Sequence, residues 1–257
     1  VDWEKAKQGF LGWFEEAFVR YLPKKGKIIE AGCGLGYYVL ALKRRGYDIE
    51  GVEWSNVAVG LIKKRYPKLN VKAGDVRNLS VKDGYYSGYI SLGVVEHFQA
   101  GPEDYLREAY RALKPGGVAF ISVPYFNLLR RIKSLFGFYR GSSVGLDFYQ
   151  YAFTETEIED LIQKSGFKVI DNFHYDAYKS IKDELPFLRN LLVLLKTYFS
   201  QSFRARHGIY PGSSPGQVID SRFRGNDKVG NFIKRPWWLK LADRYFGHMT
   251  MVICIKE

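Results

Sequence analysis

Cysteine is scarce in this chain. Only Cys33 and Cys254 occur among 257 residues, and they lie far apart in apolar stretches. Disulfide frameworks and zinc sites need several cysteines at short characteristic spacings. The sequence therefore predicts no disulfide framework and no metal site, and we expect the protein in the reducing cytoplasm.

Long apolar runs are also missing. No uninterrupted run reaches the roughly 18 to 20 residues that span a bilayer, and no signal-peptide pattern opens the chain. Hydrophobic residues nevertheless make up 46% of the chain and charged residues 26%, which is enough apolar material for a sizeable core. We expect a soluble globular protein whose residues 1–257 form a single domain with insertions.

Acidic residues are fewer than basic ones: the chain has 39 Lys and Arg and 27 Asp and Glu, which gives a net charge of +12. The excess is confined to two segments. Residues 127–140 contain four basic and no acidic residues, and residues 178–247 contain thirteen basic and five acidic residues. The rest of the chain is balanced, so a lipid, an anionic substrate or a nucleic acid would be bound through these segments.

Hydrophobic periodicity predicts strands that alternate with helices of about ten residues. The predicted strands cover residues 27–31, 47–53, 71–75, 89–92, 118–123, 167–173 and 249–255. The predicted helices cover residues 4–21, 37–45, 56–66, 103–113 and 154–165, and a turn is predicted over 114–117. Thr154 and Glu157 fit a capping box at the start of the last helix. Such alternation is typical of an α/β fold with a parallel sheet covered on both faces.

Two insertions, about 125–150 and 176–247, interrupt this alternation. The first contains a basic amphipathic pattern over 127–140, and the second contains predicted helices over 186–199 and about 235–246. Between these helices, residues 202–231 are rich in Gly, Ser and Arg, which predicts a flexible loop; its text resembles translated bacterial palindromic repeats. The helices could lie in a membrane interface, roof a pocket for an anionic amphiphile, or pack their apolar faces on the sheet.

The strongest chemical signal is the segment Glu30-Ala31-Gly32-Cys33-Gly34-Leu35-Gly36, directly after the first predicted strand. Glycines at this place permit a tight turn and a close approach of a ligand to the backbone. The dinucleotide pattern G-x-G-x-x-G is absent because its third glycine position is Tyr37, and Glu30 would repel a pyrophosphate. This departure disfavours a nicotinamide-dependent oxidoreductase, which is the alternative function on such a fold.

Four further segments follow the glycine segment: Glu53 at the end of the second strand, Gly74-Asp75-Val76, Ser91-Leu92-Gly93-Val94-Val95-Glu96-His97 and Leu113-Lys114-Pro115-Gly116-Gly117. In this order the five segments resemble those of the class I S-adenosylmethionine-dependent methyltransferases, in particular small-molecule enzymes of the ubiquinone and menaquinone type. The resemblance covers about residues 25–175 and the last strand. It implies a Rossmann-like, doubly wound, seven-stranded sheet, mostly parallel with an antiparallel last strand, and helical lid insertions.

The resemblance also implies a cofactor, S-adenosyl-L-methionine, with S-adenosyl-L-homocysteine as product. Glu30 would support the methionyl part of the cofactor directly or through water, Glu53 would bind the ribose hydroxyls, and Asp75 would meet the adenine edge. The implied cofactor-binding residues are Glu30, Ala31, Gly32, Cys33, Gly34, Gly36, Glu53, Trp54, Asp75, Val76 and Leu92.

Methyl transfer from a sulfonium is an in-line displacement, so the enzyme chiefly aligns the reactants, and it needs a base only for a protonated nucleophile. His97 is the candidate base; alternatively it caps a helix or lines the cofactor site. Glu96 and Tyr125 are the other catalytic candidates, and Glu96 could equally be structural. Some ubiquinone-pathway enzymes carry a metal-linked Glu-x-x-Glu-His pattern, but its first position here is Gly93, so we expect no metal.

The expected acceptor is a small or amphiphilic molecule, with oxygen as the methylated atom. An RNA methyltransferase is the other alternative, but family members that methylate base amino groups carry Asn/Asp-Pro-Pro-Tyr/Phe where this chain has Gly93-Val94-Val95-Glu96. We therefore expect no nucleic-acid partner, and we expect that the basic insertions could contact the inner face of the membrane. A purely binding or regulatory protein of the same fold stays open, and the sequence indicates no oligomeric state.

Overall fold

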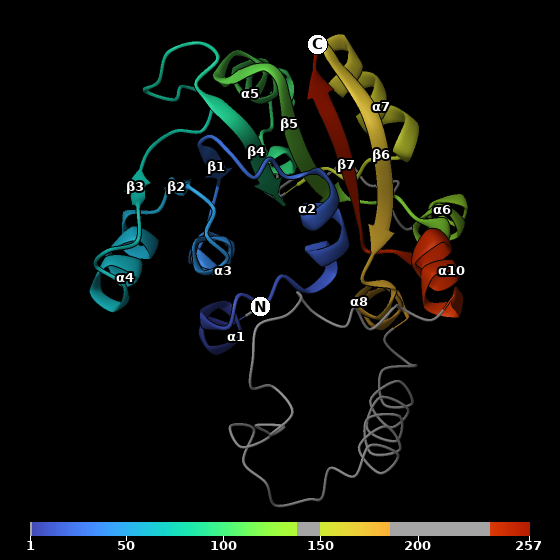
Figure 1. Ribbon diagram of the computed structural model, residues 1–257. Helices are drawn as coiled ribbons and strands as arrows, with labels where there is room; N and C mark the ends of the chain where they lie inside the picture. Colours follow the sequence, from blue (N-terminus) through green and yellow to red (C-terminus); the bar gives the residue numbers. More distant parts are fainter. Residues whose placement is uncertain (1, 138–149, 186–236) are drawn as a thin grey trace, which may run out of the picture.

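A single mixed sheet organises the molecule in the computed structural model, which describes residues 2–137, 150–185 and 237–257 (Figure 1). Its strand order is β3-β2-β1-β4-β5-β7-β6. The strands are β1 (Ile28–Ala31), β2 (Ile49–Glu53), β3 (Val71–Ala73), β4 (Tyr86–Leu92), β5 (Leu113–Pro124), β6 (Phe167–Tyr175) and β7 (Met249–Lys256). Only β7 runs antiparallel to its neighbours β5 and β6, which confirms the predicted doubly wound sheet with an antiparallel last strand.

Two hydrophobic layers cover the two faces of this sheet. Because successive residues of a strand point to opposite faces, Phe120 packs in one layer and Ile121 in the other. The helices are α1 (Trp3–Lys7), α2 (Glu15–Tyr21), α3 (Tyr37–Arg44), α4 (Asn56–Arg65), α5 (Glu103–Ala112), α6 (Leu128–Leu135), α7 (Glu155–Lys164), α8 (Ala177–Glu184) and α10 (Trp237–Phe246), and short 3-10 helices are η1 (Gly12–Phe14) and η2 (Val95–His97). Both layers are needed because a mostly parallel sheet is apolar on both faces.

The N-terminal segment differs from the prediction of one helix over 4–21. It forms α1, η1 and α2 instead, because Gly9 and Gly12 take φ values of 74° and 59°. These values lie in the left-handed region, which glycine enters readily and which ends a right-handed helix. The spacing of the aromatic residues therefore indicated which side chains face the core, but it did not indicate one continuous helix.

The predicted turn over 114–117 is also wrong, because these residues lie within β5. The strand already pairs at Leu113 with Tyr86, and the regular register resumes where Val118 faces Gly88. The extra residues of β5 form an irregularity of the ladder, as in a bulge, rather than a turn that ends the strand. In α7 the predicted capping box is confirmed, since Glu157 N–H donates to Thr154 Oγ1 at 3.2 Å and Thr154 N–H donates to Glu157 Oε2 at 2.8 Å.

The insertions contribute three described helices, α6, α8 and α10, which contact one another beside the β6 and β7 end of the sheet (Figure 1). The helix predicted over 186–199 and the loop predicted over 202–231 lie outside the described residues. The arrangement leaves the carboxyl ends of β1 to β4 for the cavity described next.

Candidate functional site

A cavity of about 570 Å³ lies at the carboxyl ends of β1, β2, β3 and β4. In a doubly wound sheet this is where the direction of strand order reverses and where ligands bind. The lining residues are Gly32, Gly34, Glu53, Trp54, Asp75, Val76, Arg77, Leu92, Gly93, Val94, His97 and Phe98. Seven of the predicted cofactor-binding residues and the predicted base are thus brought together from four segments.

The glycine loop after β1 forms one wall of this cavity. Gly32, Gly34 and Gly36 all have positive φ, at 77°, 52° and 69°. At Gly32 a Cβ would lie 2.4 Å from Val94 Cγ2, closer than any side chain can approach. A glycine is therefore required there, because the loops after β1 and β4 meet without room for a side chain.

Glu53 stands at the end of β2 with its carboxylate fixed by two backbone groups. Gly34 N–H donates to Oε2 at 2.8 Å, and Ser55 N–H donates to Oε1 at 2.9 Å. A carboxylate oxygen can accept more than one hydrogen bond, so both oxygens can still accept from a ligand in the cavity. The arrangement suits a ligand that presents two adjacent hydroxyl groups.

Asp75 is held by a residue that sequence reasoning missed. Arg77 Nη2 lies 2.8 Å from Asp75 Oδ2, and the Arg77 backbone N–H donates to Oδ1 at 2.9 Å. The hydrogen bonds from the Arg77 side chain and from its backbone N–H lower the pKa of Asp75 and keep it ionised. Arg77 also lies over the Phe98 ring, 5.2 Å from its centre. An arginine two residues after an acid was the available signal, and it was overlooked.

Glu30 lies beneath the glycine loop and does not line the cavity. Its side chain is buried, and Oε2 accepts the Val39 N–H of α3 at 3.0 Å. Burial raises the pKa of Glu30 to about 8, against the lowering effect of the Val39 hydrogen bond. A cationic ligand group nearby would favour the ionised form of this carboxylate.

His97 and Glu96 occupy different environments although they are neighbours in η2. His97 is exposed and lines the cavity, whereas only 2% of Glu96 is exposed. Glu96 Oε2 has no hydrogen-bond partner among the described residues, and burial raises its pKa to about 7. His97 can therefore reach a ligand directly, and Glu96 lies behind it.

Tyr125, the third catalytic candidate, is not among the described residues that line this cavity. Its ring stacks on His174, with ring centres 4.0 Å apart and planes 8° from parallel, and burial raises its pKa. Ala31, Cys33 and Gly36 also contribute no lining surface. Burial raises the pKa of the Cys33 thiol and keeps it protonated. Within the described parts of the chain, no group of three or more His, Cys, Asp or Glu residues could hold a metal ion.

Comparison with known proteins gives consistent results. A methyltransferase domain model matches residues 3–172. A probable S-adenosylmethionine-dependent methyltransferase of Mycolicibacterium smegmatis is 27% identical over 145 residues, covering 56% of this chain and 52% of that protein. A ubiquinone biosynthesis O-methyltransferase of Roseobacter denitrificans is 26% identical over 168 residues, covering 62% of this chain and 67% of that protein.

The fold is also found among solved structures. A SAM-dependent methyltransferase from Archaeoglobus fulgidus superposes with a TM-score of 0.55 at 15% identity, covering 94% of this chain and 90% of that chain. At this identity the match shows the fold alone. The sequence matches are partial, since the chain spans between about a third and about half of the length of the mycobacterial relatives.

Proposed function

The chain belongs to the class I S-adenosylmethionine-dependent methyltransferases, enzymes that use this cofactor as methyl donor. We propose that its cavity at β1 to β4 binds S-adenosylmethionine and presents the methyl group to the hydroxyl group of a small molecule. The observation that carries the proposal is the placement of Glu53 and Asp75 around one cavity behind the glycine loop. The volume of about 570 Å³ is in the usual range for small-molecule sites. Membership in this family argues against the alternative function of a nicotinamide-dependent oxidoreductase.

The residues present fit the cofactor by their chemistry. The Glu53 carboxylate offers acceptors for two ribose hydroxyls, Asp75 offers acceptors for an adenine amino group, and Val76 provides an apolar neighbour. Gly32 and Gly34 leave room for the methionyl part. Glu30 would act from beneath the loop, directly or through water, because its buried carboxylate favours a positive charge nearby.

His97 is proposed as the base. The bound cofactor supplies an activated methyl group, so the protein has to align the acceptor and accept its proton. His97 lines the same cavity as Leu92 and Gly93 at the end of β4, and histidine is the side chain that most often serves as a general base in enzymes. Glu96 is proposed to support this residue from the buried side, and Tyr125 to stabilise the neighbouring wall through its stack on His174.

An amphiphilic acceptor, with contact to a lipid surface, is supported by an unusual feature of α6. Arg130 is 9% exposed and its Nε donates to Glu184 Oε1 of α8 at 2.9 Å, and Lys133 Nζ donates to Glu184 Oε2 at 2.9 Å. In contrast, Leu135 and Phe136 are 77% and 76% exposed. The helix therefore directs two cations toward the protein interior and apolar side chains toward the surface. This orientation is the reverse of the one expected if its apolar face packed on the sheet.

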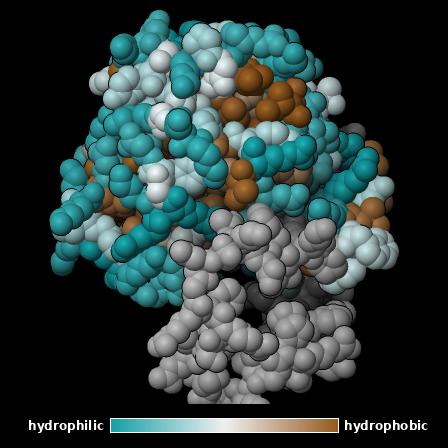
Figure 2. All heavy atoms as spheres, in the orientation of Figure 1, coloured by the Kyte–Doolittle hydropathy of each residue, from teal (hydrophilic) through white to brown (hydrophobic). Residues whose placement is uncertain are grey.

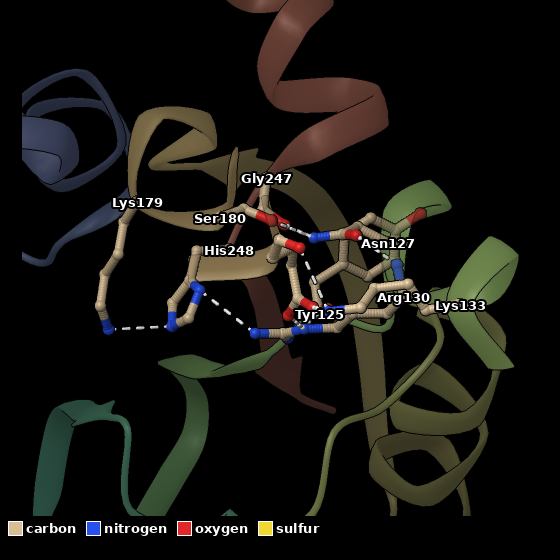
Figure 3. A network of polar contacts seen from close by, with 9 residues as sticks. Tyr125, Asn127, Arg130, Lys133, Lys179, Ser180, Gly247 and His248 are labelled. Atoms are coloured by element: carbon tan, nitrogen blue, oxygen red, sulfur yellow. Dashed lines mark hydrogen bonds and ion pairs between the residues drawn. The ribbon is translucent and has the colours of Figure 1, made fainter. Parts of the chain in front are cut away.

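The inward face of α6 belongs to a buried polar network (Figure 3). Asn127 Nδ2 donates to Ser180 Oγ at 2.6 Å and to the Gly247 carbonyl at 2.9 Å. Arg130 also donates to the Tyr125 carbonyl at 2.7 Å. These hydrogen bonds join the two insertions to each other and fix which face of α6 points outward.

α10 likewise buries a charged side chain and exposes apolar ones. Asp243 is 2% exposed and accepts the Ala177 N–H at 2.9 Å, whereas Trp237 and Trp238 are 77% and 50% exposed. Figure 2 shows hydrophobic surface on the right, where Figure 1 places α6 and α10. Because basic helices with exposed tryptophans and aliphatic residues bind membrane interfaces, we propose peripheral lipid contact here. No helix within the described residues is long and apolar enough to cross a membrane.

Titration calorimetry with S-adenosylmethionine tests the cofactor site. The protein should bind the cofactor, and Glu53→Ala should weaken binding by about tenfold or more because two charge-assisted hydrogen bonds to the ribose are lost. Asp160→Ala, which removes an exposed carboxylate on α7, is the matched control and should bind as the unchanged protein does. No binding at about 1 mM cofactor would refute the proposal.

The base and the acceptor are tested together. Mass spectrometry of cell extracts incubated with the enzyme and methyl-labelled cofactor should reveal the labelled acceptor. With that acceptor, His97→Ala should lower kcat by about 100-fold, the usual contribution of a general base, while cofactor affinity stays unchanged. A loss below about threefold would count against His97 as base. Labelled RNA in place of a small molecule would favour the nucleic-acid alternative.

A further inference from the structure

Arg77 lines the cofactor cavity and also a neighbouring cavity of about 410 Å³ beside α5. Asp75 is the other residue that lines both cavities. Asp75 is the proposed acceptor for the adenine amino group of the cofactor, whereas Arg77 has no assigned part in that contact. The contacts of Arg77 with its surroundings indicate what it contributes there.

The other arginines that line this neighbouring cavity have carboxylate partners of their own. Arg107 Nη2 lies 3.0 Å from Asp104 Oδ1, and Arg111 Nη2 donates to Glu108 Oε1 at 2.7 Å. Both pairs join residues three positions apart on α5, which lie on the same side of a helix. These pairs leave Arg77 as the guanidinium that serves the acid shared by the two cavities.

The Arg77 side chain contacts both carboxylate oxygens of Asp75. Nε lies 3.1 Å from Oδ1 and 3.2 Å from Oδ2, and Nη2 donates to Oδ2 at 2.8 Å. The planar guanidinium thus meets the carboxylate at two points, and such a contact fixes the plane of the carboxylate as well as its position. Each oxygen can still accept a further hydrogen bond from a ligand.

The guanidinium of Arg77 is in turn supported by aromatic rings. It lies over the Phe98 ring, 5.2 Å from its centre, and a cation is attracted to the face of such a ring. Phe98 stacks on Tyr105 of α5, with ring centres 5.7 Å apart and planes 29° from parallel, and Tyr105 is fully buried. Contacts therefore lead from the core through Phe98 and Arg77 to Asp75.

We propose that Arg77 is a positioning residue for recognition of the adenine base, because it holds the Asp75 carboxylate in the one orientation in which it accepts the amino group. This inference rests on the proposed function and deepens it, since it names the residue that makes the site selective for adenine over hypoxanthine. Hypoxanthine has a carbonyl oxygen in place of the amino group. A carboxylate accepts from an amino group and repels a carbonyl oxygen, so the selectivity depends on how firmly the carboxylate is held.

Two ligands that differ in this group of the base test the proposal by titration calorimetry with the full chain, S-adenosylhomocysteine and S-inosylhomocysteine. Neither carries the sulfonium charge of the cofactor, so losing a cation from the protein changes their affinity little through long-range attraction. The unchanged protein should bind S-adenosylhomocysteine at least about tenfold more tightly. Asp75→Asn should remove most of this preference, because an amide can both accept from the amino group and donate to the carbonyl oxygen.

Arg77→Met should reduce the preference to about threefold or less, since it removes the side-chain hydrogen bonds and keeps the backbone N–H that donates to Asp75. Arg77→Lys should give an intermediate preference, because an ammonium keeps the charge without the planar contact. Arg107→Met, which removes an exposed arginine from the neighbouring cavity, is the matched control and should keep the full preference. An unchanged melting temperature verifies that each variant folds.

The proposal is overturned if Arg77→Met keeps the full preference. Equal losses of affinity for both ligands would also overturn it, because they would show that Arg77 only maintains the shape of the cavity. An equal drop in preference in Arg107→Met would indicate a general effect of charge and would overturn it as well. Binding of neither ligand at about 1 mM by the unchanged protein would refute the cofactor site itself, whereas equal binding of both would refute only the selectivity.

Discussion

At the scale of single residues, the site divides into positions that a motif defines and positions that only packing defines. Gly32, Glu53 and Asp75 were predictable because a turn without room for a Cβ and acids that end parallel strands leave a mark in the sequence. Arg77 was missed, because its place two residues after Asp75 does not show that its side chain turns back onto that acid. Glu30 was a candidate because of its motif, but its burial beneath the loop became visible only in the fold.

The buried state of Glu30 has a consequence for stability. Its pKa is raised from 4.5 to about 8, so the folded protein holds a proton that the unfolded chain releases. This contribution to stability is fully present below pH 4.5 and is lost as the pH rises through 8. Glu30→Gln keeps an acceptor for Val39 without a charge, so its melting temperature should rise relative to the unchanged protein between pH 5 and 9.

Thermal melts of both proteins without cofactor measure this difference. Glu157→Gln, which alters an exposed acid in the capping box of α7, is a control whose relative melting temperature should not follow the same course. Parallel melting curves for Glu30→Gln and the unchanged protein across this range would contradict a buried, protonated Glu30.

At the scale of elements, the sequence predicted the strands and the central helices and failed where two effects compete. Periodicity identified the apolar positions of residues 4–21, but positive φ at Gly9 and Gly12 divides the segment. On α6, periodicity shows that one face is apolar and the other basic, but not which face points inward. Glu184, 54 residues further along the chain than Arg130, determines that orientation by pairing with it.

The α6 and α8 contact should therefore be essential to this end of the molecule. Arg130→Met removes the donor of Glu184 Oε1 and one of the two donors of the Tyr125 carbonyl. Because Lys133 still pairs with Glu184 Oε2, we expect a loss of about 1 to 3 kcal/mol. The double variant Arg130→Met with Glu184→Met should recover part of this loss, because neither charge then stays buried alone.

Urea unfolding of the single and double variants measures these free energies. Arg107→Met is the matched control, since Arg107 is 75% exposed in its pair with Asp104 and such surface pairs contribute at most about 1 kcal/mol. A loss below about 1 kcal/mol for Arg130→Met would show that the network of Figure 3 contributes little to stability.

At the scale of the whole molecule, the net charge of +12 resolves into a balanced body and basic insertions. On α6 and α10 the only acid is Asp243, which is buried, while Arg131, Lys240 and Arg244 are exposed. Exposed cations thus border the exposed apolar side chains of the same two helices. This combination is suited to an anionic lipid surface.

Vesicle flotation tests this surface. The protein should float with vesicles that contain phosphatidylglycerol and much less with pure phosphatidylcholine, because the attraction is partly electrostatic. Leu135→Ser with Phe136→Ser should reduce the bound fraction severalfold by removing buried apolar area. Val57→Ser with Leu61→Ser, at positions of α4 that are 74% and 54% exposed, is the matched control and should bind normally.

Two outcomes would contradict a lipid-binding surface on α6. Equal losses in both double variants would indicate nonspecific adhesion rather than a defined surface on α6. Tight binding of tRNA in a gel shift without any flotation would assign the basic insertions to nucleic acid instead.

The position of β7 shapes how this sheet can be assembled during protein synthesis. β7 lies between β5 and β6 although residues 176–248 separate it from β6 in the sequence. Until the ribosome has released β7, the facing edges of β5 and β6 have no partner, and unpaired strand edges invite pairing with other chains. The long connection itself costs little, because loop-closure entropy grows only logarithmically with length, by about 0.6 kcal/mol per doubling. This chain could therefore acquire large insertions between its last two strands at a small thermodynamic cost, while the sheet stays incomplete until translation of its final strand.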